Sequence, residues 1–191
     1  MAVTLTIAQQ PAADQVLSED PFALLVGMLL DQQYPMEHAF MGPSKILTRF
    51  ETLDPARIAE ADPEAFAQLC STPPAIHRYG RSMAGRVQAL AVVVRDSYDG
   101  DAAQIWTTAG STAELLSRLK ALPGFGDQKA RIFAALLAKQ LGVQHEGWRE
   151  EIGPYAEDGS YRSVADVVDA ESLQKVRAFK KEQKAAAKAA G

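Results

Sequence analysis

The sequence has little of what disulfides and metal sites require. It contains one cysteine, Cys70, and three histidines, His38, His77 and His145, in 191 residues. A single thiol excludes an intrachain disulfide and a four-cysteine zinc or iron–sulfur site, and the histidines lack the spacing of metal ligands. We therefore expect no metal centre and no iron–sulfur cluster.

Long hydrophobic runs are also missing. No apolar run approaches the roughly 18 residues that a membrane helix needs, and residues 1–7 carry no basic segment before a long apolar stretch. We therefore expect a soluble, unsecreted, cytoplasmic protein without a membrane partner. The balance of 20 Lys and Arg against 24 Asp and Glu is mildly acidic, and local patches decide whether such a chain binds nucleic acid.

Strand-like alternation is confined to residues 3–7, whereas helical patterns fill the rest of the chain. Hydrophobic residues make up 47% of the chain, enough for one compact domain or two small lobes around one cleft. Aspartate–proline pairs predict helix starts at Pro21, Pro55 and Pro63. Residues 22–30 are apolar nearly all round, which predicts a central buried helix. A long helix is expected from Ile76 to about Ser97.

The C-terminal segment, residues 175–191, is strongly basic, with six Lys and Arg against one Glu. We expect a basic C-terminal helix or tail there. Its lysines would either neutralise nucleic-acid phosphates or form a solvated helix end.

Two helical patterns meet at a short turn, and this helical hairpin is expected over residues 112–142. Its turn contains Gly124 and Gly126, which let the backbone adopt unusual conformations and approach a ligand. The free N–H groups at the start of the second helix can point at an anion such as phosphate, and Lys129 adds a positive charge nearby. The alternative is an ordinary pair of helices in which glycine caps one helix and starts the next.

Leu122-Pro123-Gly124-Phe125-Gly126, followed by Ala130, resembles the helix-hairpin-helix signature of the HhH-GPD superfamily of base-excision DNA glycosylases. Residues 21–33, an apolar helix ending in two glutamines, are similar to the first conserved block of that family. Residues 79–87 are similar to its tyrosine-containing turn and basic helix. The three blocks follow in order over about residues 20–145. The resemblance implies an all-α, two-lobed single domain over residues 1–191, in a small bacterial subfamily without an iron–sulfur cluster.

Glycosylases of this kind extrude a base from the duplex and fill the gap it leaves. The resemblance implies that Gln32 or Gln33 is the wedge, and that double-stranded DNA with a damaged base is the partner of a monomer. Hairpins of the family often hold a monovalent cation through backbone carbonyls, and no other cofactor is implied. The hairpin residues expected to contact DNA are Leu122, Gly124, Phe125, Gly126, Lys129 and Arg131.

The resemblance also implies the chemistry. Gln128 occupies the position that holds the nucleophilic lysine in lyase members, so no Schiff base is expected and the glycosylase should be monofunctional. Lys129 lies one residue later and would serve only if the register were shifted. The family's catalytic aspartate falls 18 positions beyond Gln128, on Glu146, with Glu150 and Glu151 as alternatives. Glu146 and Gln128 are thus the predicted catalytic-site residues.

Three hypotheses follow. The first is base-excision repair by a monofunctional DNA N-glycosylase, acting on a uracil, oxidised, alkylated or deaminated base. The second is a helix-hairpin-helix DNA-binding or lesion-sensing module that has lost catalysis, motivated by the missing lysine and aspartate. The third is a helical protein-interaction domain.

Overall fold

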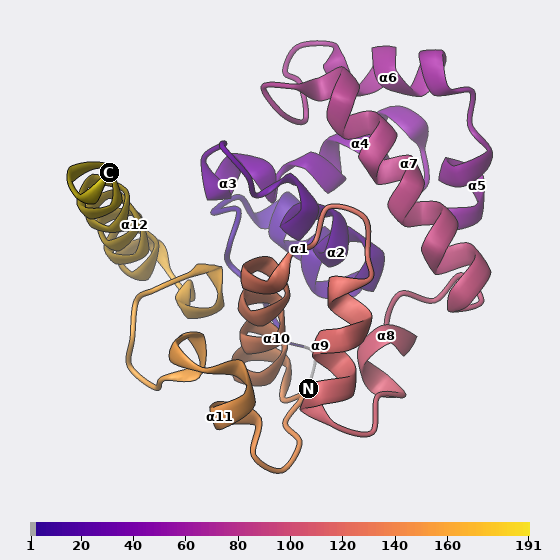
Figure 1. The fold of residues 1–191 in the computed structure, drawn as a ribbon. Coiled ribbons are helices and arrows are strands. Elements are labelled where there is room, and N and C mark those ends of the chain that lie inside the picture. The colour runs from indigo at the N-terminus through magenta and orange to yellow at the C-terminus, as the bar shows by residue number, and fades with distance from the viewer. Residues whose placement is uncertain (1–2) are drawn as a thin grey trace.

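The structure, a computed structural model, describes residues 3–191, and within that range it contains helices and turns but no strand (Figure 1). The predicted all-α class is therefore confirmed. No helix in this range is long and apolar enough to cross a membrane. The elements are α1 (Pro11–Glu19), α2 (Pro21–Leu30), α3 (Met36–Ala39), α4 (Gly42–Phe50), α5 (Pro55–Glu60), α6 (Pro63–Ser71), α7 (Gly80–Ser97), α8 (Gln104–Thr107), α9 (Thr112–Lys120), α10 (Asp127–Leu141), α11 (Trp148–Ile152), the 3-10 helices η1 (Pro154–Ala156) and η2 (Val164–Asp166), and α12 (Ala170–Ala190).

Local capping explains where several helices begin. The Asp20 carboxylate accepts hydrogen bonds from the N–H groups of Phe22 and Ala23 at the start of α2. Asp54 and Asp62 do the same for α5 and α6, and each of these three helices has proline in its first turn. These caps satisfy N–H groups that have no partner inside the helix, so the predicted starts at Pro21, Pro55 and Pro63 are confirmed.

The long helix α7 begins at Gly80, four residues later than predicted from Ile76. The intervening residues form a turn in which the N–H of Tyr79 donates to Nδ1 of His77 at 3.0 Å. This side-chain bond competes with a helical hydrogen bond and keeps the segment out of the helix. The alternating segment 3–7 likewise finds no strand partner; instead the Leu5 N–H donates to Oγ of Ser18 in α1.

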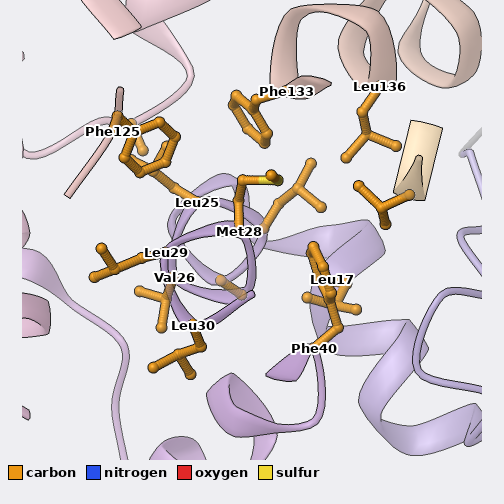
Figure 2. Close-up of a cluster of buried hydrophobic side chains, with 14 of the residues drawn as sticks. Leu17, Leu25, Val26, Met28, Leu29, Leu30, Phe40, Phe125, Phe133 and Leu136 are labelled. Carbon is orange, nitrogen blue, oxygen red and sulfur yellow. The ribbon is translucent and has the colours of Figure 1, made fainter. Parts of the chain in front are cut away.

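Helix α2 lies at the centre of the core, and nine of its ten residues are buried. Viewed along α2 in Figure 2, Phe125, Phe133 and Leu136 lie on one side of it, and Leu17 and Phe40 lie on another. One lobe contains α1 to α7 and the other contains α8 to α12, so α2 joins them through shared apolar packing. This contact brings the end of α2 close to the α9–α10 hairpin.

Helix α12 projects along one side of the molecule, next to α3 (Figure 1). Arg177 forms an ion pair with Glu37 of α3 at 3.1 Å, and Lys180 lies 3.7 Å from Asp31 at the end of α2. The predicted basic C-terminal segment is therefore a helix that contacts the first lobe.

Candidate nucleic-acid interface

The α9–α10 hairpin has two glycines in different environments. Gly124 has φ of +79°, and a Cβ built on it would lie 2.5 Å from Cδ1 of Leu29 in α2. Only glycine fits there without strain or movement. Gly126 has φ of −91°, and a Cβ there would meet no protein atom within 4 Å. Internal packing therefore requires glycine at 124 but leaves open space beside Gly126.

The N-terminus of α10 is left uncapped by side chains among the described residues. Gly126 is its N-cap, whereas α9 is capped by Ser111 and α12 by Asp169. The first N–H groups of a helix have no intrahelical acceptor, and the helix dipole places partial positive charge at this end. Gly126 is exposed, so these groups can meet an anion from outside.

The side chains of Leu122 and Phe125 point into the protein rather than toward a ligand. They are 3% and 5% exposed, and the Phe125 ring packs edge-on against Phe133 with centroids 6.1 Å apart. The expectation that these two residues bind DNA is therefore corrected for their side chains. Their apolar groups anchor the hairpin to the core, and only backbone groups at this turn remain for a ligand.

Lys129 and Arg131 are also turned toward the protein, contrary to the expected phosphate contacts. The Lys129 ammonium donates to the carbonyls of Met28 and Leu29 at 2.9 and 3.1 Å. Burial lowers the pKa of Lys129 to about 8, although the charge of Asp31 opposes that shift. Because helix C-terminal carbonyls carry partial negative charge, they attract this ammonium and tie α10 to α2.

Arg131 makes a similar internal contact on the other side of the hairpin. Its guanidinium donates from Nη1 to the carbonyls of Glu151 and Ile152, at 2.6 and 3.1 Å, and from Nε to Asp127. These bonds fasten the last turn of α11 to α10. Arg131 therefore stabilises the lobe, and its charge is already partnered inside it.

The two candidate wedge residues lie in the loop after α2, and their side chains differ in how firmly hydrogen bonds hold them. The Gln32 side chain donates to the Leu29 carbonyl at 3.0 Å and accepts from Arg86 at 3.1 Å. Gln33 is exposed, has a left-handed backbone with φ of +51°, and its carbonyl accepts from Arg78. No hydrogen bond of the described residues involves the Gln33 side chain, so of the two it is the one free to insert.

His77 holds this loop in place. It is buried, its Nδ1 accepts from the Tyr79 N–H, and its Nε2 lies 2.9 Å from the Gln32 carbonyl, so Nε2 carries the proton and the ring is neutral. Burial lowers the pKa of His77, and the charges of Arg78, Lys129 and Arg86 lower it further, which favours the same neutral form.

Two cavities flank α12: one lies within the second lobe, and the other lies between the first lobe and α12. One, of about 470 Å³, is lined by Gln128 together with Ile132, Tyr155 and Phe179. The other cavity, of about 950 Å³, lies beside the loop after α2 and is lined by Asp31, Gln32, Gln33, Tyr34, Pro35, His38 and Arg78. Lys180 and Lys184 line both cavities. Both volumes lie in the range of small-molecule pockets.

Tyr155 is the residue that sequence reasoning missed. Its hydroxyl accepts a hydrogen bond from Nε2 of Gln128 at 2.9 Å, although 27 positions separate them. The chain reverses through α11 and η1 after α10 and returns along it, which brings Tyr155 to the start of α10. No spacing rule in the sequence links the two positions.

Glu146 does not share a site with Gln128, which corrects the predicted pairing. Helix α10 has 15 residues, so its two ends lie about 20 Å apart at a rise of about 1.5 Å per residue. Glu146 follows the far end, where the adjacent His145 lies 2.9 Å from the carbonyl of Ala109, before α9. Spacing alone misplaced it because the chain makes a turn there and only later returns along α10.

The two alternatives also lie outside the cavity beside Gln128. Glu150 and Glu151 belong to α11, both are exposed, and neither lines either cavity. Figure 1 shows α11 at the lower edge of the molecule, away from the hairpin turn.

A two-lobed helical fold with a glycine hairpin next to an interlobe cleft defines the class of protein. The family model of the HhH-GPD superfamily base excision DNA repair protein matches residues 26–190. The chain belongs to this superfamily, whose members are DNA glycosylases, and its function class is base excision DNA repair. No curated protein matches the chain significantly.

Proposed function

We propose that this protein is a monofunctional DNA glycosylase that hydrolyses the N-glycosidic bond of a flipped damaged or mispaired base in double-stranded DNA. The observation that carries the proposal is the proximity of the uncapped α10 N-terminus, the free Gln33 side chain and the Gln128 cavity: Gln128 lies in the first turn of α10, and Lys180 and Lys184 line both its cavity and the one beside Gln33. A glycosylase needs all three features: contacts to the DNA backbone, a side chain that fills the gap left by the flipped base, and a pocket for that base.

The hairpin would bind the DNA backbone through main-chain N–H groups near Gly126, where a Cβ would meet no protein atom within 4 Å. Gln33 would fill the gap left by the flipped base, because its side chain is exposed and its loop is held by His77. Lys180 and Lys184 supply positive charge at the cavity mouths. A monovalent cation at the hairpin stays a prediction of the family resemblance.

The absence of lyase chemistry is proposed from two residues. Gln128 offers an amide instead of an amine, and Lys129 holds its ammonium against the carbonyls at the end of α2. A Schiff base requires a primary amine that reaches the sugar. The expected product is therefore an abasic site with an intact strand.

A base-release assay tests the proposal. Labelled duplexes, each with one uracil, oxidised, alkylated or deaminated base, are incubated with the full-length protein, and alkali is added to half of each sample. Strand cleavage only after alkali is expected, on at least one lesion. Cleavage without alkali would contradict the monofunctional mechanism.

One observation favours a second candidate function, a non-catalytic lesion-binding module: in the part of the chain that the structure describes, no carboxylate lines the cavity beside Gln128. Under that function, the protein would bind lesion-containing duplexes tightly and release no base from any of them. The same panel, read by fluorescence anisotropy as well as base release, separates the two functions.

A further inference from the structure

Base hydrolysis requires a negative group close to the reacting sugar. As the N-glycosidic bond breaks, positive charge builds on the deoxyribose, and a carboxylate can stabilise that charge and accept the proton of the attacking water. Glu146 lies beyond the opposite end of α10 from Gln128, and Glu150 and Glu151 line neither cavity. The expected carboxylate must therefore come from another part of the chain.

Among residues 3–191, Asp31 is the only acidic residue that lines either of the two cavities beside α12. It is the C-cap of α2 and directly precedes Gln32 and Gln33, so it lies beside the proposed wedge. A carboxylate in this position would face the sugar of a nucleotide displaced by the wedge.

The surroundings of Asp31 are unusual for a structural carboxylate. Its side chain is only 8% exposed, yet no hydrogen bond of the described residues ends on it, and its ion-pair partner Lys180 lies at 3.7 Å, beyond hydrogen-bond length. Buried carboxylates normally accept hydrogen bonds. Asp31 therefore keeps its accepting capacity for a group that enters the cleft.

Two ammonium groups compensate the negative charge of Asp31. Lys180 approaches from α12, and Lys129 approaches from α10, where the charge of Asp31 favours its protonated form. Lys129 is held by the carbonyls of Met28 and Leu29. Lys180 is exposed enough to turn to a DNA phosphate when the duplex binds, which would leave the Asp31 carboxylate facing the sugar.

We propose that Asp31 is the catalytic carboxylate of this protein; the inference rests on the proposed glycosylase function. Water forms the new bond to C1′ of the deoxyribose and passes a proton to the Asp31 carboxylate. The C1′–N bond breaks, its electron pair leaves with the base, and the base takes a proton from solvent. Asp31 returns its proton to solvent, so the products are the free base and an abasic sugar.

Single-turnover base release tests the assignment on the lesion that the wild type processes. Asp31→Asn should lower the rate about 10²–10³-fold, the usual cost of removing a group that stabilises transition-state charge. Its affinity for a duplex with an abasic-site analogue should stay within about threefold of wild type. Asp158→Asn is the matched control, because Asp158 forms an exposed ion pair with Arg149 at 2.8 Å outside the cleft; it should keep the wild-type rate.

Each outcome decides a different point. A wild-type rate for Asp31→Asn, or a comparable loss for Glu146→Gln, would overturn the assignment of Asp31 alone. No release by the wild type on any lesion would reject the glycosylase function and the assignment with it. If Asp31→Asn does not fold, Asp31→Glu keeps the charge and moves the carboxylate by one methylene; it should slow release about tenfold with binding retained, and an unchanged rate would overturn the assignment.

Discussion

The two hairpin glycines give a paired prediction, because they have different reasons to be glycine. Gly124→Ala places a methyl group 2.5 Å from Cδ1 of Leu29 and forces alanine into a left-handed backbone with φ of +79°. The backbone penalty is about 1–2 kcal/mol. Overpacking against a buried side chain adds about 1–3 kcal/mol. Alanine also lowers the conformational entropy of the unfolded chain, which stabilises the folded state by about 0.4–1 kcal/mol. We expect a net loss of roughly 1–4.5 kcal/mol in unfolding free energy.

Gly126→Ala should leave the stability within about 1 kcal/mol of wild type, because the entropic gain from alanine opposes the weaker N-cap. Its methyl group would occupy the open space in front of the α10 N-terminus. Duplex affinity should therefore fall for Gly126→Ala although the fold is intact.

Urea unfolding followed by circular dichroism measures the stabilities, and fluorescence anisotropy with a labelled duplex measures the affinities. The double variant Leu29→Ala, Gly124→Ala should be destabilised less than the sum of the two single variants, since the clash partner is gone, with a coupling of about 1 kcal/mol or more. Equal destabilisation by Gly124→Ala and Gly126→Ala would refute the packing argument. Unchanged duplex affinity for Gly126→Ala would refute the role of the hairpin in binding.

Three further predictions follow. Borohydride should trap no covalent DNA complex, because Gln128 has no amine and Lys129 is held at the end of α2; a trapped complex would contradict monofunctional chemistry. Gln33→Gly keeps the left-handed backbone and removes the wedge, so base release should fall, whereas Glu51→Gly, at a comparable φ of +68° at the C-cap of α4, should have no effect. The folded-state pKa of His77 lies below 6.5, so the unfolded chain binds the proton more readily and the stability due to neutral His77 is full above about pH 6.5 and falls below it. Between pH 7 and 5, the unfolding free energy measured with urea should fall more steeply for wild type than for His77→Gln. An equal fall in the two proteins would contradict the assignment of a neutral His77.

The sequence by itself determined the helical class, several helix starts and the hairpin. Asp20, Asp54 and Asp62 cap helices through bonds to residues two or three positions away, and such short-range interactions depend little on the rest of the fold. The uniformly apolar segment of α2 predicted its central burial for the same reason: no face of that helix is suited to water.

Only the tertiary structure decided where the charged groups near the hairpin point. Lys129 and Arg131 appear in the sequence as cations beside a phosphate-binding turn, yet both donate to carbonyls at the ends of other helices. Those carbonyls come from residues up to 101 positions away, and local spacing carries no information about them.

The position of the candidate catalytic carboxylate also depended on the tertiary structure. Counting from Gln128 selected Glu146, but the chain turns away after α10 and returns with Tyr155 beside Gln128. Asp31 reaches the cleft because α2 packs between the two lobes, so its position depends on long-range apolar contacts. Sequence spacing sets distances within a helix, whereas the meeting of distant segments is set by the packing of the core.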